Sequence, residues 1–227
     1  MSINNIKPNF KKAIFYTKKQ LPDFVSDAMN LEGIAVTVPE VQTLLEGISI
    51  GGHKQSDITI TNNQIEAWKS LFNSLEENKF EVSKSFTCKL HSIAAKEESL
   101  TWGHFRNAAV SISGTNYKPP IYNTLDDRWN SMLNDFHNIS DIFEKASFVF
   151  LTMAKNQFFF DVNKRMGRFM MNSILLYHGY PAINVQAKRK QEFNQLMIEY
   201  YESNNMQDMR QFLLSCIPTE LIDVMSK

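Results

Sequence analysis

The chain has 227 residues, of which 43% are hydrophobic, enough for a sizeable buried core in about one to one and a half domains. Its 8 glycines and 7 prolines fall well below the roughly 12% of ordinary usage, which excludes a disordered linker and disfavours a fold of many short strands. Basic and acidic residues number 24 each, and this zero net charge argues against general electrostatic binding to nucleic acid.

The first part of the chain reads as a series of helices. Residues 1–35 are expected to form an N-terminal extension of one or two short helices. Thr37-Val38-Pro39-Glu40 is typical of a helix start, because proline and an acidic side chain favour the first turn, and this helix should end near Gly47. A longer helix is predicted from about Ile60 and another through residues 86–94, both with apolar residues at helical spacing.

One segment departs from the helical pattern. In Ala109–Tyr117, apolar and polar residues alternate around Gly114, which predicts a small β-hairpin that ends before Pro119-Pro120. An isolated hairpin is barely stable in water, so we expect it to lean on the helices or to serve as a flap.

Helices are predicted again after the hairpin. They cover Leu125–Phe136, Ile142 to about Asn156, and a segment from about Asn163 that stops before Gly179 and Pro181. Two or three more should cover residues 188–225. The expected fold class is therefore an all-α helical bundle with a small β-hairpin flap. Its parts are an N-terminal extension at 1–35, a main unit at 36–205, and C-terminal helices at 206–227 packed on the same unit.

The cysteines and the apolar runs indicate the compartment. Cys88 and Cys216 lie far apart and match no metal-binding spacing, so reduced thiols of an intracellular protein are expected. No apolar run approaches the roughly 18 residues of a membrane span, and the N-terminal residues show no apolar signal block. We expect a cytoplasmic protein without membrane or nucleic-acid partners.

The most informative stretch lies between two strongly apolar helices, at Gln157–Arg168. Arg165 and Arg168 are three residues apart on the first turns of a helix, so they share a face, although cations are unfavourable at a helix N-terminus. An anion held by both side chains and by free backbone N–H groups would account for them, and Asp161 could hold Mg²⁺ that bridges phosphate oxygens. The alternative interpretation is a solvated helix start in which the arginines pair with carboxylates and Asp161 caps the helix.

This stretch closely resembles the signature of the Fic family (filamentation induced by cyclic AMP), His-x-Phe-x-Asp/Glu-Gly/Ala-Asn-Gly/Lys-Arg-x-x-Arg. The matching positions are Phe159, Asp161, Asn163, Lys164, Arg165 and Arg168. His91, itself expected to be a core residue, precedes Gly103-His104-Phe105-Arg106 as in the family's lead-in to its flap. Leu45-Glu46-Gly47 resembles the end of the family's inhibitory motif, Ser/Thr-x-x-x-Glu-Gly/Asn. The resemblance covers roughly residues 36–205.

The resemblance implies a nucleotidyl transferase that usually moves AMP from ATP onto a hydroxyl side chain of a target protein. It implies that Asp161 binds Mg²⁺, and that Asn163, Lys164, Arg165 and Arg168 bind the phosphates. Arg168 would hold the γ-phosphate or pair with the inhibitory Glu46. The flap would bind the target segment by strand addition, through residues that include Val110, Ile112, Gly114 and Tyr117. The target protein stays unidentified, and a homodimer is left open.

Three positions depart from the family pattern. Gln157 occupies the position of the catalytic histidine, and an amide cannot carry away the proton of the attacking hydroxyl. A general base contributes about 10²–10⁴-fold in rate, so we expect weak or no transfer activity. Val162 replaces the small residue of the phosphate loop, and Gln42 stands where the inhibitory motif has Ser or Thr. The alternative is a nucleotide-binding pseudoenzyme or a regulatory interaction module of cell division; a nucleic-acid-binding helical regulator is the weakest candidate.

Overall fold

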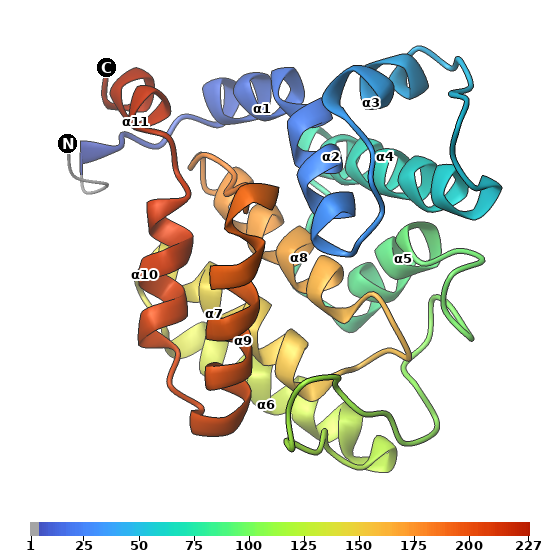
Figure 1. Ribbon diagram of the computed structural model, residues 1–227. Coiled ribbons are helices and arrows are strands. Elements are labelled where there is room, and N and C mark those ends of the chain that lie inside the picture. The colour runs from blue at the N-terminus through green and yellow to red at the C-terminus, as the bar shows by residue number, and fades with distance from the viewer. Residues whose placement is uncertain (1–4) are drawn as a thin grey trace.

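The computed structural model describes residues 5–227, and all its regular structure is helical (Figure 1). The expected all-α class is confirmed, and the first four residues of the predicted N-terminal extension lie outside the described residues. Within the described range the α-helices are α1 (Phe10–Lys19), α2 (Leu21–Leu31), α3 (Val38–Leu45), α4 (Gln55–Glu76), α5 (Lys84–Ala94), α6 (Leu125–Asn138), α7 (Ile142–Asn156), α8 (Asn163–Tyr177), α9 (Lys190–Ser203), α10 (Gln207–Ser215) and α11 (Thr219–Ser226).

Local sequence signals explain where several helices begin and end. Thr37 and Glu40 form a capping box at the start of α3: the Glu40 carboxylate accepts from Thr37 N at 2.7 Å, and Glu40 N donates to Thr37 Oγ1 at 3.4 Å. Gly179, in the left-handed region with φ of 78°, follows the end of α8 and lets the chain turn away. The start of α4 lies at Gln55, earlier than the expected Ile60.

Helix α8 lies at the centre of the molecule, and α7 packs against it (Figure 1). The two helices approach closely at Gly167, where a Cβ atom would lie 2.7 Å from Phe150 Cδ2 and 2.8 Å from the Phe150 carbonyl oxygen. A glycine is therefore required at this contact. One hydrophobic core runs from Ile6 to Met225, so the first and last helices share it. The two ends meet where Lys7 N donates to Met225 O at 2.9 Å (Figure 1).

The predicted β-hairpin is not formed: the described residues contain no strand, and Ala109–Tyr117 makes only a turn at Ser113-Gly114. Its polar groups are bonded to partners other than an opposing strand. Thr115 Oγ1 accepts from Tyr117 N and donates to Glu202 of α9, while the Tyr117 ring stacks on Tyr201 with centroids 6.1 Å apart. The alternation of apolar residues thus reflects packing of a loop on α9, not a two-stranded ladder.

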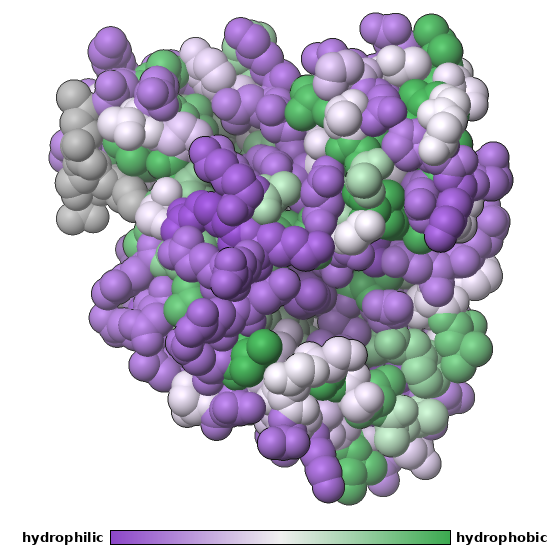
Figure 2. Space-filling model, viewed as in Figure 1, coloured by the Kyte–Doolittle hydropathy of each residue, from purple (hydrophilic) through white to green (hydrophobic). Residues whose placement is uncertain are grey.

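The surface in the same orientation is mostly hydrophilic, with apolar atoms gathered at the lower right (Figure 2). That area lies over the segment between α5 and α6, whose exposed large apolar side chains include Leu100, Trp102 and Ile121. Among residues 5–227, no helix combines the length and the apolar character needed to cross a bilayer. Both cysteines are free thiols.

Candidate functional site

The loop between α7 and α8 begins and ends in left-handed backbone. Gln157 has φ of 48° and ψ of 60°, and Val162 has φ of 63° and ψ of 12°. A β-branched residue with positive φ is a conformational outlier that persists only where surrounding contacts impose it. Val162 is buried, so packing of its side chain supplies those contacts. The positive φ at this position explains why the family pattern has a small residue there.

Both the oxygen and the nitrogen of the Gln157 side-chain amide form hydrogen bonds within the protein. Its Oε1 accepts from Asn163 Nδ2 at 3.0 Å, and its Nε2 donates to the Ala154 carbonyl at 2.6 Å. The Gln157 carbonyl oxygen in turn accepts from Arg106 Nε. Gln157 therefore closes the C-terminus of α7 and joins it to the start of α8.

The Asn163 side chain holds the loop in place through two hydrogen bonds to the backbone of Phe159. Its Oδ1 accepts from Phe159 N at 2.9 Å, and its Nδ2 donates to the Phe159 carbonyl at 2.8 Å. The Phe159 ring stacks at 3.7 Å on His91, whose Nδ1 accepts from Gly103 N at 3.0 Å. His91 is fully buried, as expected of a core residue, and burial lowers its pKa to about 4.

Asp161 lies exposed at the mouth of the site, where its Oδ1 accepts from Val162 N at 2.6 Å. Residues 5–227 hold no cluster of three or more His, Cys, Asp or Glu side chains that could bind a metal unaided. Mg²⁺ is usually bound by one or two carboxylates together with substrate phosphates and water. A single exposed carboxylate beside a helix N-terminus therefore fits Mg²⁺ that arrives with a phosphate ligand.

The first arginine of the motif, Arg165, forms a buried ion pair with Glu98. Nη1 donates to Glu98 Oε2 at 2.9 Å, and Nη2 donates to Glu98 Oε1, so the pairing is bidentate. Glu98 comes from the segment between α5 and α6, and sequence reasoning did not identify it. No motif marks it, because the pairing joins residues far apart in the chain.

The second arginine, Arg168, pairs with Glu32, the residue that follows α2. Arg168 Nη2 donates to Glu32 Oε1 at 3.3 Å, and Lys164 Nζ lies 3.6 Å from Glu32 Oε2. Burial raises the pKa of Glu32, but the charges of Arg168, Lys164 and Arg165 outweigh burial and hold that pKa below its usual value. Both arginines are thus paired with carboxylates, as the alternative interpretation of the motif stated, although both are buried rather than solvated.

The expected pairing of Glu46 with Arg168 is wrong. Glu46 is exposed at the end of α3, and the carboxylate beside Arg168 belongs to Glu32. The tripeptide Leu-Glu-Gly occurs at both places, Leu31-Glu32-Gly33 and Leu45-Glu46-Gly47, and neither glutamate has Ser or Thr four residues earlier. The sequence pattern therefore could not choose between them, whereas the packing of α2 near α8 does.

The motif loop and the start of α8 border a cleft of about 260 Å³. Its walls come from the motif loop, the start of α8, the segment between α5 and α6, and α9; the lining residues are Glu32, Ser111, Ile112, Ser113, Gln157, Asp161, Val162, Asn163, Lys164, Arg165 and Tyr201. Ile112 of the predicted flap is therefore at the cleft, while Val110 is half-buried beside it, Gly114 forms the exposed turn and Tyr117 packs on α9. Of the predicted flap residues, the structure thus brings Ile112 to the residues of the motif loop.

Arg106 is a residue whose role sequence reasoning missed. Its buried guanidinium donates to the carbonyls of Ala108 at 2.8 Å and Pro120 at 2.6 Å, besides that of Gln157. Both ends of the loop and the C-terminus of α7 are thereby held by one side chain. The sequence signal that could have identified Arg106 is its position at the end of Gly103-His104-Phe105-Arg106, the segment that resembles the family's lead-in to its flap.

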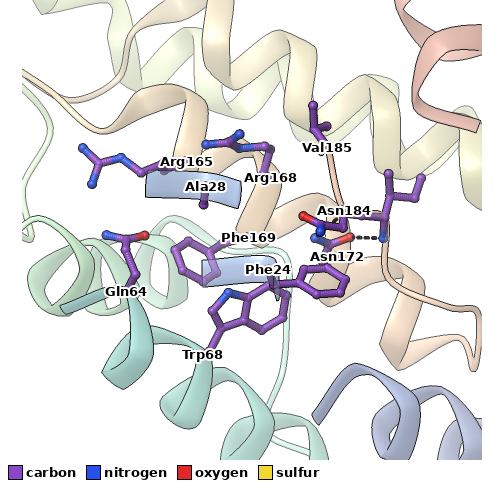
Figure 3. A pocket seen from close by; sticks show the side chains of 11 residues that line it. Phe24, Ala28, Gln64, Trp68, Arg165, Arg168, Phe169, Asn172, Asn184 and Val185 are labelled. Atoms are coloured by element: carbon purple, nitrogen blue, oxygen red, sulfur yellow. Dashed lines mark hydrogen bonds between the residues drawn. The ribbon is translucent and has the colours of Figure 1, made fainter. Parts of the chain in front are cut away.

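A second, smaller cavity of about 30 Å³ lies behind the arginines (Figure 3). Phe24, Trp68 and Phe169 form its aromatic side, and Arg165 and Arg168 extend from α8 along its edge (Figure 3). Asn172, also at this cavity, accepts from Ile183 N at 2.8 Å and so fixes the segment after α8. The volume is about that of one water molecule, so this cavity is too small to hold a nucleotide.

Comparison with known proteins identifies relatives of this architecture. Residues 81–175 match the family model of the Fic/DOC family. A Fic-domain-containing signalling protein from Bacteroides thetaiotaomicron gives a TM-score of 0.76 at 16% identity and covers 98% of this chain and 90% of its own. Fic-1 from C. elegans gives a TM-score of 0.72 at 18% identity, with 92% of this chain and 61% of that chain covered.

A Fic family protein from Desulfovibrio desulfuricans gives a TM-score of 0.73 at 15% identity, with 91% of this chain and 64% of that chain covered. The chain thus spans less than two thirds of the second and third of these structures. At such identities the likeness shows a shared fold. Comparison with curated protein sequences gave no match.

Proposed function

This chain contains a domain of the Fic/DOC family, and from that premise we propose that it binds an ATP-type nucleotide with Mg²⁺ in the cleft at the start of α8. Three cationic side chains support this proposal: Lys164 and Arg165 line the cleft, and Arg168 pairs with Glu32, which also lines it. The free N–H groups of the first turn of the helix support it as well. Planar guanidinium groups and helix N-termini are the usual partners of phosphate in proteins. Asp161 would hold Mg²⁺, which would neutralise phosphate charge.

The proposed chemistry is that of the family, transfer of AMP to a hydroxyl side chain of a target protein, at a strongly reduced rate. The observation that carries this conclusion is the bonding of Gln157: both ends of its amide are used within the protein. An amide has no accessible basic pKa, and here its oxygen is already occupied by Asn163. Gln157 cannot accept the proton of an attacking hydroxyl, so the step loses its general base.

The same observation favours a second candidate, a non-catalytic nucleotide-binding module. Phosphoryl-type transfer depends mainly on positioning and on electrostatic stabilisation, and the residues proposed for those roles are present. A protein that retains them and lacks a base would bind nucleotide without turning it over. Its partner would then respond to the nucleotide-bound state.

Binding is tested by calorimetry with Mg²⁺ and the non-hydrolysable ATP analogue AMP-PNP. Arg165→Ala and the milder Arg165→Lys should weaken binding by about tenfold or more, the value of a charge-assisted hydrogen bond to phosphate. Arg128→Ala removes an exposed cation on α6 outside the cleft and serves as the matched control. Because Glu32 lies in the cleft, the series is repeated in a Glu32→Gln background. Equal affinity of all variants would contradict the phosphate site.

The two candidates are separated by incubation with radiolabelled ATP and a cell lysate. An enzyme labels a target protein or itself, whereas a binding module leaves all proteins unlabelled. Binding by calorimetry without labelling would identify the non-catalytic module.

A further inference from the structure

The two ion pairs at the motif arginines differ in geometry. Arg165 uses both terminal nitrogens on Glu98, and the side chains are only 4% and 15% exposed. Arg168 makes one contact of 3.3 Å with Glu32, which it shares with Lys164. A buried bidentate pair is held firmly by charge and by geometry, whereas a single shared contact is more easily exchanged for another anion.

The pairs also differ in where their carboxylates lie. Glu32 is one of the residues that line the cleft, so an anion that enters the cleft meets it directly. Glu98 is absent from the described residues that line the cleft, although its partner Arg165 is present among them. Glu98 therefore contacts Arg165 from outside the cleft, and a ligand can reach Arg165 without displacing Glu98.

We propose that Glu98 is a positioning residue that holds the Arg165 guanidinium toward the cleft both before and after an anionic ligand binds. The inference rests on the proposed nucleotide function for the identity of that ligand, a nucleoside polyphosphate. The two carboxylates then have opposite effects. Glu32 occupies the place of the ligand and weakens its binding, whereas Glu98 fixes a group that the ligand needs.

The backbone around Glu98 is shaped to present this side chain. Glu97 adopts the left-handed region with φ of 61°, which is uncommon for a residue other than glycine. Glu98 N and Ser99 N both donate to the Ala95 carbonyl, at 3.2 and 3.1 Å, so the chain turns back immediately after α5. The carboxylate of Glu98 is thus fixed by a tight turn rather than by a mobile loop.

The Arg165 side chain depends on Glu98 for its orientation. Within the described part of the chain, buried Arg165 Nε has no hydrogen-bond partner, so the hydrogen bonds that orient the guanidinium are those to Glu98. Without Glu98 the group would be buried and unpaired, which is costly. It would rotate toward another carboxylate, such as Glu32 or Asp161, and leave its place at the cleft.

The experiment compares Glu98→Gln with Glu97→Gln, a neighbouring exposed carboxylate whose nearest cation, Lys96, is 3.8 Å away. Calorimetry is done with Mg²⁺ and AMP-PNP, and separately with adenosine, which carries no phosphate. Glu98→Gln should lower the affinity for AMP-PNP about tenfold and leave that for adenosine unchanged within twofold. Glu97→Gln should change neither. Glu98→Asp, which keeps the charge, should recover part of the loss.

A second measurement does not require the ligand. In ¹⁵N-labelled protein, the Arg165 guanidinium signals, assigned with Arg165→Lys, should be sharp and separate because bidentate pairing slows rotation, and Glu98→Gln should broaden them. Unchanged signals in Glu98→Gln would overturn the proposal, as would tighter binding of AMP-PNP, which would make Glu98 a second competitor. Equal losses for AMP-PNP and adenosine would indicate a general structural defect and overturn it too. If the wild type binds no AMP-PNP, the proposed function fails, and the guanidinium signals alone decide the role of Glu98.

Discussion

Glu32, which follows α2, lies 3.3 Å from Arg168 on α8, and through this contact the N-terminal helices reach the cleft at the start of α8. The same carboxylate is 3.6 Å from Lys164. Phosphate oxygens and the Glu32 carboxylate would compete for the same two cations. Binding of a polyphosphate at Arg168 therefore requires that Glu32 withdraw.

Replacement of Glu32 by Gln should raise the affinity for AMP-PNP several-fold, because it removes the competing charge without a large change in shape. The nucleotide-free protein should lose stability by more than the ~1 kcal/mol of an exposed pair and by less than the ~3–5 kcal/mol of a fully buried one. Glu46→Gln is the matched control, since this exposed glutamate follows the same Leu-Glu-Gly pattern and should change neither quantity. Calorimetry and thermal melting measure both effects. A gain in affinity from Glu46→Gln would restore the original assignment.

The comparison of Glu32 with Glu46 shows where sequence reasoning reaches its limit. Thr37-Val38-Pro39-Glu40 predicted a helix start correctly, because a capping box is made by residues that are three apart in the chain. Glu32 and Arg168 are 136 residues apart, and their pairing depends on how α2 packs near α8. The sequence identified the motif arginines, but not the carboxylates that pair with them.

The segment between α5 and α6 shows a similar limit, because its sequence did not reveal the partners of its backbone hydrogen bonds. Its alternating pattern predicted strands, and the structure has none at Ala109–Tyr117, although Ile112 is partly buried there. An alternating pattern records which side chains face the protein and does not record which groups accept the backbone hydrogen bonds. Here the carbonyls of Ala108 and Pro120, which would begin and end a ladder, both accept from Arg106.

Arg106→Lys should therefore loosen this segment. A lysine keeps the charge but cannot reach carbonyls on both ends of the loop at once, because it lacks the planar fork of the guanidinium. We expect a loss of about 2 kcal/mol or more in the free energy of unfolding, since buried carbonyls would lose their donor. Limited proteolysis should cut residues 107–121 faster than in the wild type. Arg128→Lys, on an exposed face of α6, is the control, and equal cleavage rates in both variants would refute this role of Arg106.

His91 should make the stability depend on pH in a defined range. Burial lowers the pKa of His91 to about 4, from the 6.5 of an unperturbed histidine. The unfolded chain therefore takes up a proton below pH 6.5 that the folded protein does not take up until about pH 4. Stability is present in full above pH 6.5, falls between pH 6.5 and 4 by up to about 3 kcal/mol, and then levels off.

His91→Gln tests this dependence, because the amide can replace both hydrogen-bonding ring nitrogens but does not titrate. Urea unfolding is measured between pH 4 and pH 7.5 in buffer without divalent ions. The difference in stability between wild type and variant should shrink as the pH falls, even though burial lowers the pKa of His178 as well, because His178 is present in both proteins. Parallel curves for the two proteins would show that His91 does not carry the effect.

Restoration of the missing base is the strongest test of the proposed chemistry. Gln157→His introduces an imidazole at the end of α7, beside Asn163, whose Nδ2 now donates to the Gln157 amide. If the phosphate-binding groups are in place, labelling of the protein itself or of a target with radiolabelled ATP should rise at least tenfold, the lower part of what a general base supplies. Because Glu32 competes for Arg168, the effect should be larger in a Glu32→Gln background.

Gln157→Ala is the matched control for Gln157→His, since it removes the same two hydrogen bonds and adds no base. It should stay at the wild-type level of labelling, so that any rise in Gln157→His reports the imidazole and not a loosened loop. If Gln157→His binds AMP-PNP but labels nothing, the loop geometry itself prevents transfer. Val162 would then be the position to change next, because its left-handed backbone is the one a glycine adopts without strain. Labelling restored only by Gln157→His with Val162→Gly would assign the loss of activity to both positions together, and no labelling in that double variant would identify the protein as a non-catalytic nucleotide-binding module.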